Sequence, residues 1–226
     1  MKKTTIPSPR RRSALSREHI VAAAIELLDD HGESGLTFQA LSKRLATGPG
    51  AIYWHVADKS DLLAAACDAV ISPLFHRLSA DATPREAIHA ASGMLFDTID
   101  SHPWVGSVLT SLPGRMPMVR VLECLGQQVT ALGVSPNDQW THVSTLLMYI
   151  LGVAGQNAAN AKLAMEMKLD RSAFLDDVSL AWSKFPEEDY PFTRRMAERV
   201  RTHDDREDFL TGVDLIVRGA LPTART

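Results

Sequence analysis

The chain has 226 residues, 45% of them hydrophobic and 23% charged, and a formal net charge of −3 at pH 7. This composition is typical of a folded globular protein and favours a folded over a disordered chain. The longest apolar stretch is well short of the roughly 20 residues that a membrane span needs, and no apolar signal segment follows the basic start. We therefore expect a cytoplasmic protein.

Positive charge is concentrated at the beginning of the chain. Residues 1–59 contain nine Lys or Arg and six acidic residues, a net charge of +3, whereas the remainder carries −6. Arg10, Arg11 and Arg12 lie among proline and serine, so we expect residues 1–15 to form a flexible basic arm. Such an arm suits a phosphate backbone or a minor groove, but a solubilising tail would have the same composition, and both interpretations stay open.

The first half of the chain shows helical periodicity with helical start and stop signals. Ser16 is a candidate cap for a helix over residues 17–31, and Gly32 is its stop. Thr37 is a candidate cap for a short helix, and after a link at residues 46–48, Pro49 is well placed as the first residue of a third helix. A fourth helix is expected over residues 59–79.

The second half continues in the same way. Thr83, Pro84 and Glu86 form a capping box that starts a helix ending near residue 101, and His102-Pro103 breaks it. Because alternating strands are absent, we predict an all-α fold. Further helices are expected at about 103–111, 116–132, 136–162, 171–184, 190–202 and 205–219. We predict three parts: the arm at 1–15, a small three-helix domain at 16–60 with its linking helix at 59–79, and a larger helical domain at 80–220.

Residues 36–59 are the most informative segment. Two short helices joined by a short link, the second rich in small residues, are typical of a helix-turn-helix. Gly50 and Ala51 keep the second helix narrow enough to approach a major groove about 12 Å wide. The sequence therefore predicts a three-helix unit that binds DNA, joined by the fourth helix to a larger helical bundle.

This segment resembles the TetR family of bacterial transcriptional regulators over about residues 16–72. The resemblance is carried by Ala51, Tyr53, Trp54, His55, Val56, Lys59, Leu62 and Leu63. It implies a repressor that binds a palindromic operator in double-stranded DNA as a homodimer. A small-molecule effector would release it.

The resemblance also implies roles for single residues. Thr37 would cap the first helix of the motif and touch phosphate, Gly48 would cap the recognition helix, and the residues after it would face the bases. The implied DNA-contacting set is Thr37, Gly48, Pro49, Gly50, Ala51, Tyr53, His55 and Lys59, to which we add Lys43, Thr47, Arg10, Arg11 and Arg12 as candidates.

Several of these assignments have a competing interpretation. The family usually has an apolar residue in place of Thr47 and a Ser or Thr cap in place of Gly48, so we hypothesise that Thr47 and the basic arm share in reading the sequence. We expect Trp54 to pack against the first helix, and Tyr53 to point outward. Lys43 and Arg44 are typical of a solvated face with incidental phosphate attraction.

The closing segment, residues 208–219, resembles the helix that pairs two chains in TetR-type proteins. With an earlier helix at about 136–160 it would form a four-helix bundle between two copies of the chain, as a palindromic operator requires. The predicted dimer residues are Phe209, Val213, Ile216 and Val217 on one face and Gly155, Ala158 and Ala159 on the other.

A mainly apolar organic effector is expected in the middle of the chain, on helices that line the cavity in this family. The candidate ligand-binding residues are Phe96, Ile99, His102, Trp104, Met116, Met118, Leu122, Met148, Tyr149 and Gln156. A filled core without a cavity is the alternative for any single one of them. A regulator whose C-terminal domain serves only dimerisation or protein contacts, or an activator, is the alternative function.

An enzyme or a metalloprotein is not expected. The eight histidines show no ligand spacing with cysteines or acids, and no glycine-rich phosphate loop is present. Cys67 and Cys124 lie in apolar helical patterns that favour buried thiols over a disulfide. We therefore predict no cofactor, no metal and no catalytic residues.

Overall fold

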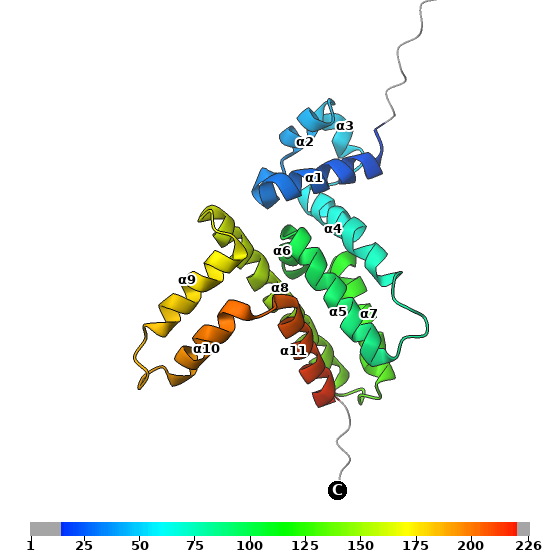
Figure 1. The fold of residues 1–226 in the computed structure, drawn as a ribbon. Helices are drawn as coiled ribbons and strands as arrows, with labels where there is room; N and C mark the ends of the chain where they lie inside the picture. The colour runs from blue at the N-terminus through cyan, green and yellow to red at the C-terminus, as the bar shows by residue number, and fades with distance from the viewer. Residues whose placement is uncertain (1–14, 221–226) are drawn as a thin grey trace, which may run out of the picture. The chain divides into compact units, whose positions relative to one another are not determined.

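The computed structural model describes residues 15–220 and forms eleven α-helices there, with no strand in that range, which confirms the all-α prediction (Figure 1). The predicted basic arm, with Arg10, Arg11 and Arg12, lies outside the described residues. The helices are α1 (Arg17–Gly35), α2 (Phe38–Arg44), α3 (Pro49–Tyr53), α4 (Lys59–Phe75), α5 (Pro84–Ser101), α6 (Trp104–Ser111), α7 (Met116–Ala131), α8 (Gln139–Glu166), α9 (Arg171–Ser183), α10 (Pro191–Thr202) and α11 (Asp205–Ala220).

The chain divides into two compact units, Met1–Leu62 and Leu63–Thr226. Helices α1, α2 and α3 belong to the first unit, whereas α4 begins in the first and continues into the second. The core of the first unit is apolar, because each of its helices turns one stripe of side chains inward. This core contains Ile20, Ala24, Leu28, Leu41, Ile52, Val56 and Leu62.

Helix α1 starts where the sequence predicts and is interrupted where the sequence predicts. The Ser16 hydroxyl accepts a hydrogen bond from the backbone N–H of His19, which caps the helix. Gly32 has φ 65° and ψ −172°, a conformation that is open to glycine and not helical. A last turn follows it to Gly35, so the element is longer than the predicted range 17–31.

The capping box predicted at the start of α5 is present. The Thr83 hydroxyl accepts from the backbone N–H of Glu86 at 3.3 Å, and the Glu86 carboxylate accepts from the backbone N–H of Thr83 at 2.8 Å. The Thr83 hydroxyl also donates to the Glu86 carboxylate at 2.7 Å. This bond and the one from the Thr83 backbone N–H hold the pKa of Glu86 below its usual value, because they stabilise the ionised form. The helix ends at Ser101, and Pro103 follows before α6, as predicted.

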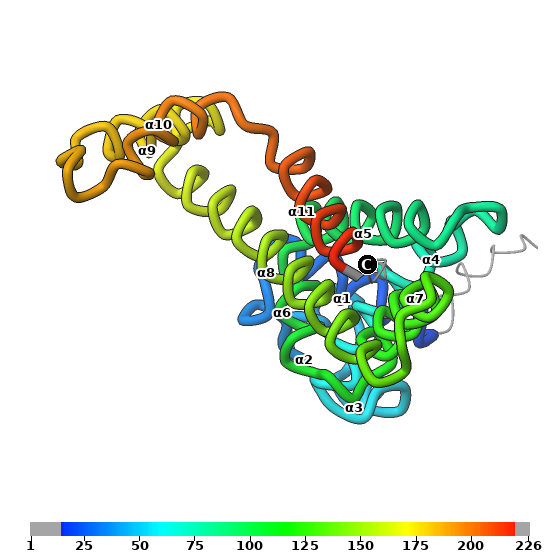
Figure 2. Tube along the Cα trace, turned by 90° about the horizontal axis from the view of Figure 1, so that it is seen from below, coloured from blue at the N-terminus to red at the C-terminus, as the bar shows by residue number. Residues whose placement is uncertain are grey.

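In the second unit, α8 is the central helix, and it packs against α5, α6, α7 and α11. Figure 2 shows α9 and α10 lying side by side as an arm beyond the C-terminal end of α8. The fully buried side chains of this unit come from several helices, so one apolar core joins them. They include Ile88, Leu95, Ile99, Val105, Leu109, Val121, Leu125, Ile150 and Val213.

Helix α8 ends later than predicted, at Glu166 and not at about 162. Lys168 adopts φ 58°, its N–H donates to the carbonyl of Met165, and the N–H of Leu169 donates to the carbonyl of Ala164. This pair of bonds is the Schellman ending that glycine usually makes. Because the chain has no glycine there, the sequence did not mark the end of the helix.

Both cysteines are free thiols, and Cys67 is buried as expected. Burial raises the pKa of Cys67 to about 12 and that of the half-buried Cys124 to about 11. Among residues 15–220, no helix is long and apolar enough to cross a membrane. The same residues contain no group of three or more His, Cys, Asp or Glu side chains that could hold a metal ion.

Candidate nucleic-acid interface

The first helix of the predicted motif, α2, is fixed at both ends by hydrogen bonds. The Thr37 hydroxyl accepts from the backbone N–H of Ala40 at 3.0 Å, so the predicted cap is confirmed. The Ser42 hydroxyl donates to the carbonyl of Phe38, and Leu41 is fully buried. The helix is thus anchored to the core by one face and exposes Lys43 and Arg44 in its last turn.

A tight turn connects α2 to α3. The N–H of Ala46 donates to the carbonyl of Lys43, and the N–H of Thr47 donates to the carbonyl of Ser42. This is a Schellman ending, in which the residue at the position of Ala46 takes the left-handed conformation, here φ 49°. The turn is therefore built by backbone bonds, and its left-handed residue carries a side chain where glycine is usual.

Helix α3 begins with three residues that present very little side chain. Gly48 occupies the cap position without a side-chain hydrogen bond, as predicted, and Pro49 follows at the first helical position. Gly48, Pro49 and Gly50 are exposed, and a Cβ added at Gly50 would meet no atom within 4 Å. Ile52, fully buried, anchors the helix from its other side. The N-terminal end of α3 thus offers backbone N–H groups with little in front of them.

The structure separates the aromatic residues at the end of α3. The Tyr53 ring is about half exposed and stacks on Phe38, with the ring centroids 4.4 Å apart. Trp54 is 89% exposed, so the prediction that it packs against the first helix is wrong. Ile52 and Val56, four residues apart, already fill the core, and Trp54 lies between them on the opposite side.

Most predicted DNA-contacting residues of the described part are on the surface. Thr37, Lys43, Gly48, Pro49, Gly50, Tyr53 and Lys59 are exposed, whereas Thr47, Ala51 and His55 are half-buried. Trp54 is an exposed neighbour that the sequence reasoning assigned to the core. Trp54 lies two residues from both Ile52 and Val56, and this spacing could have shown that it faces away from the core.

The positive charges of the first unit differ in what they contact. Arg17 donates to the carbonyl of His55 and pairs with Asp61 at 3.1 Å. Arg44 pairs with Glu26 at 2.8 Å and with Asp30 at 3.1 Å. These two guanidinium groups therefore connect helices of the unit, a role that the sequence reasoning did not assign to them.

Lys43 and Lys59, the two lysines among the described residues of the first unit, also differ from one another. The Lys59 ammonium donates to the carbonyl of Glu33 at 2.6 Å. Lys43 has no ion-pair or hydrogen-bond partner among the described residues, although it is exposed. An unpaired ammonium group is the one that most readily accepts a phosphate as its partner.

The predicted effector residues do not gather at one described cavity. Phe96, Ile99, Trp104 and Met118 are buried, and His102, Leu122 and Tyr149 are half-buried. Met116, at the start of α7, is exposed. Met148 and Gln156 are exposed because α8 turns Leu147, Ile150 and Leu151 toward the core. Phe96, Met116 and Leu122 line three separate cavities.

Ser92, which the sequence reasoning missed, is the polar group that stands out in the core of the second unit. Its side chain is fully buried, and its hydroxyl oxygen has no hydrogen-bond partner among the described residues. Ser92 lies on α5 four residues after Ile88 and three before Leu95, which are both buried. A hydroxyl in such an apolar setting is costly unless something bonds to it.

Three of the predicted dimer residues lie in the core of the single chain. Phe209, Val213 and Val217 are buried, and the Phe209 ring stacks on Phe96 with centroids 4.7 Å apart. The hydroxyl of Tyr149 donates to the carbonyl of Phe209 at 3.1 Å. A partner chain would therefore not reach these three side chains, because α8 and α5 already cover them.

All but one of the remaining predicted dimer residues are more accessible. Ile216 and Gly155 are half-buried, Ala159 is exposed, and Ala158 is buried. On the same two helices, Met148 is 57% exposed and Leu215 is 62% exposed. The apolar groups available to a partner are thus neighbours of the predicted residues rather than most of those residues themselves.

Comparison with known proteins supports the fold and the motif. A family model described as "Bacterial regulatory proteins, tetR family" matches residues 20–66. The structure is similar to that of the transcriptional regulator SCO7222, a TetR from Streptomyces coelicolor, with 49% sequence identity and a TM-score of 0.80. That similarity covers 91% of this chain and 97% of the other.

Further relatives match over different lengths. An HTH-type transcriptional regulator of Saccharopolyspora erythraea is 35% identical over 46% of this chain and 44% of its own length, so the match spans less than half of that relative. The class D tetracycline repressor of Escherichia coli is 27% identical over 91% of this chain and 88% of its own length. The structure of BioQ with its double-stranded DNA operator is 27% identical, with a TM-score of 0.61 over 92% of this chain and 99% of that one.

Proposed function

The chain belongs to the TetR family of bacterial transcriptional regulators, and from this we propose that it is a homodimeric repressor that binds a palindromic operator and leaves it when a small organic effector binds. Residues 16–60 would be the DNA-binding domain. Residues 80–220 would bind the effector and pair two chains.

The observation that carries the DNA-binding proposal is the bare, exposed N-terminal end of α3. Gly48, Pro49 and Gly50 leave backbone N–H groups accessible, and such groups at a helix start attract phosphate or face base edges. Thr37, Lys43 and Tyr53 are exposed on the same three-helix unit and would contact the backbone beside it. The DNA operator in the BioQ structure supports this assignment by similarity.

A substitution at Gly50 tests this directly. A leucine there meets no protein atom within 4 Å of its Cβ, so we expect Gly50→Leu to fold normally. The same side chain would stand between α3 and the DNA, and we expect operator affinity to fall by at least about tenfold, or about 1.4 kcal/mol. Fluorescence anisotropy with a duplex selected from random DNA measures the loss.

Gly114→Leu is the matched control. Gly114 is an exposed glycine between α6 and α7, and a Cβ there also meets nothing within 4 Å. We expect this variant to bind the duplex as the unchanged chain does. Equal binding by Gly50→Leu and Gly114→Leu, with both proteins folded, would contradict the assignment of α3 to DNA.

For the dimer we propose pairing through the outward faces of α8 and α11. The two helices lie against each other in one unit (Figures 1 and 2). They expose the side chains of Met148 and Leu215. Large exposed apolar side chains on adjacent helices mark contact surfaces. Gly152 and Ala159, both exposed on α8, would allow a partner helix to approach closely.

Light scattering tests the pairing. We expect the unchanged chain to have twice the mass of one chain, and the double variant Met148→Glu with Leu215→Glu to have the mass of one. Leu180→Glu, at a 54% exposed leucine of α9, is the control and should remain a dimer. A double variant that stays dimeric would contradict pairing through these faces of α8 and α11.

For the effector we propose a mainly apolar molecule with one hydrogen-bonding group, bound in the core around α5. Phe96 and Ile99 supply apolar surface on that helix, and the unpartnered hydroxyl of Ser92 supplies a polar contact. Binding to the folded state alone raises apparent stability, so a thermal shift screen would find the molecule.

Ser92→Ala then distinguishes a ligand contact from a packing defect. Removing the unsatisfied hydroxyl should leave the free protein equally stable or up to about 1 kcal/mol more stable. The same variant should reduce the thermal shift given by the effector. An unchanged shift would remove Ser92 from the effector site.

A further inference from the structure

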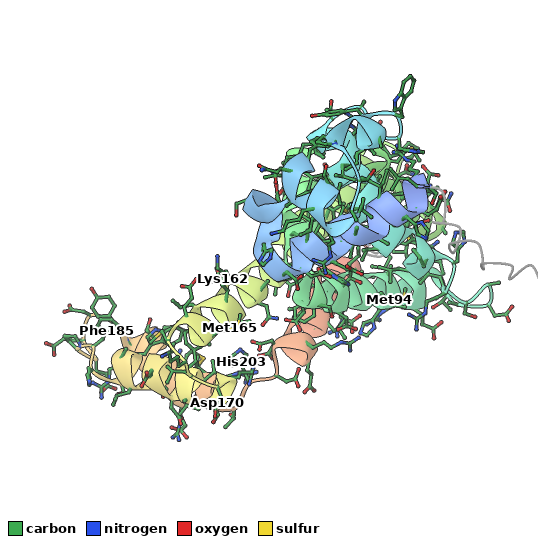
Figure 3. The ribbon with its side chains drawn as sticks, turned by 90° about the horizontal axis from the view of Figure 1, so that it is seen from above. Met94, Lys162, Met165, Asp170, Phe185 and His203 are labelled. Atoms are coloured by element: carbon green, nitrogen blue, oxygen red, sulfur yellow. The ribbon has the colours of Figure 1, made fainter. Side chains whose placement is uncertain are left out.

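A cavity lies at the base of the arm, and Ser92 is not among the residues that line it. It has a volume of about 820 Å³ and is formed by α5, the C-terminal half of α8, the start of α9 and the segment that leads into α11. Figure 3 shows Lys162 and Met165 on α8 near His203 and Asp170, which mark the base of the arm. Its volume falls within the roughly 300–1,000 Å³ typical of sites for small organic molecules.

The floor of this cavity is apolar. Phe96, Ala164 and Leu175 line it and are buried, and the half-buried Phe174 adds a second aromatic ring. Phe96 is held in place by stacking on Phe209. Rigid aromatic and aliphatic walls favour the apolar body of a ligand.

Two arginines line the cavity, and both are already neutralised. Arg206 donates to both oxygens of Asp97, at 2.7 and 3.0 Å. Arg171 donates to Asp205 at 2.7 Å and to the carbonyl of His203 at 2.8 Å, which ties α9 to the segment before α11. These paired groups hold the walls together and leave little positive charge for an anionic ligand.

The acidic side chains are not all paired in this way. The lining contains four aspartates against Lys168 and the two arginines, a net charge of −1 with His203 neutral. Asp100 accepts from the side-chain amide of Asn157 at 2.7 Å through one carboxylate oxygen. Its second oxygen has no partner in the described part of the chain. Lys168, which also lines the cavity, is exposed.

Asp204 does not compete for the same role. One of its carboxylate oxygens accepts from the backbone N–H of Glu207 at 2.8 Å, as a cap for α11. Backbone hydrogen bonds and the nearby arginines keep the pKa of Asp204 below its usual value. It therefore stays ionised and adds to the negative potential, while Asp100 offers the available oxygen.

We propose that the cavity at the base of the arm binds an organic cation with an aromatic or aliphatic body, with its charge at Asp100 and its body against Phe96 and Phe174. A charge-assisted hydrogen bond to the carboxylate gives the cation its orientation. Aromatic faces add an attraction for cations that they do not have for anions. The carboxylate of this site, Asp100, is separate from the proposed effector contact at Ser92, although both proposals use Phe96. The site does not depend on DNA binding.

Two dyes with the same ring skeleton and opposite charge test the proposal. Rhodamine 6G is a cation and fluorescein an anion, and each is titrated by fluorescence anisotropy with the full chain in the absence of DNA. We expect saturable binding of one rhodamine 6G per chain and at least about tenfold weaker binding of fluorescein. Equal affinities for the two dyes, or no saturable binding of rhodamine 6G, would overturn the proposal.

Variants then locate the site. Asp100→Asn keeps the size of the side chain and its hydrogen bond to Asn157, and it should weaken rhodamine 6G by about tenfold. Asp177→Asn, at an exposed acid of α9 outside the cavity, should change nothing. Phe174→Ala should weaken rhodamine 6G by about fivefold and should weaken fluorescein less.

An Asp100→Asn variant that binds rhodamine 6G as tightly as the unchanged chain contradicts the site. Binding that saturates at one dye per two chains would place the dye between copies and not in this cavity, and it would also contradict the proposal. Operator affinity is measured on the same variants without dye. A result against the cation site therefore does not contradict the DNA-binding proposal. A result against DNA binding does not contradict the cation site.

Discussion

At the scale of single residues, the turn before α3 contains a residue with an unfavourable backbone conformation. Ala46 has φ 49°, a conformation that is less favourable by about 1–2 kcal/mol for residues with a Cβ than for glycine. We expect Ala46→Gly to raise the free energy of unfolding by up to about 1 kcal/mol, since the cost of glycine's greater freedom offsets part of the gain. Urea unfolding of the full chain measures the change.

Ala40→Gly is the control for this prediction, because Ala40 lies within α2. There glycine should lower stability by about 0.5–1 kcal/mol. Two variants that lower stability equally would show that the turn does not have the left-handed residue described here.

Lys43 and Arg44 are adjacent, yet they should contribute differently to DNA binding. Arg44 is engaged by Glu26 and Asp30, whereas Lys43 has no partner in the described range. We expect Lys43→Gln to reduce the slope of log affinity against log salt concentration by about 1, the change expected for one phosphate contact. Arg44→Gln should leave the slope unchanged, and titrations at several salt concentrations compare the two. A larger effect from Arg44→Gln would reverse the assignment.

At the scale of elements, the packing of α11 on α8 depends on a glycine. A Cβ at Gly212 would overlap the ring of Tyr149, whose hydroxyl bonds to the carbonyl of Phe209. We expect Gly212→Ala to displace that ring and to cost about 1–3 kcal/mol of stability. Thermal or urea unfolding measures the loss.

Gly126 offers a matched comparison. It lies within α7, and a Cβ there meets nothing within 4 Å, so Gly126→Ala should raise stability by about 0.5–1 kcal/mol. If Gly212→Ala were stabilising to the same degree, the close approach of α11 to α8 would not exist in solution.

The positions of the helices could be predicted from the sequence better than the residues at which they end. Periodicity and capping residues predicted every helix, and Thr37 and the Thr83 to Glu86 box act as caps as expected. The ends failed where the usual marker was missing, as at Lys168, which closes α8 without glycine. Such a helix end is formed by backbone hydrogen bonds, and no particular residue type in the sequence marks it.

The sequence predicts which face of a helix is apolar. It does not predict whether that face packs on the same chain or on a second copy. Phe209, Val213 and Val217 do form one apolar stripe of α11, but that stripe packs on α5 and α8 of the same chain. A stripe of this kind looks the same in sequence whether its partner is the same chain or another. For the same reason Met148 and Gln156 were expected at the effector and are exposed.

At the scale of the whole molecule, the two compact units, Met1–Leu62 and Leu63–Thr226, have different proposed tasks. The first carries the exposed end of α3, and the second carries the proposed pairing surface and two proposed ligand sites. A repressor needs both, because a palindrome is recognised by two copies held at a fixed spacing. An effector that changes operator affinity by about 5–150-fold would need a coupling free energy of only about 1–3 kcal/mol.

The central claim is that a symmetric pair of these chains recognises a palindrome through α3. Selection of bound duplexes from random DNA by the purified full chain tests it most directly. We predict an enriched palindrome with half-site centres one helical turn apart, about 34 Å, bound by two chains and weakened steeply by salt. Enrichment of a single non-repeated site bound by one chain, or no enrichment by a folded dimer, would contradict the claim.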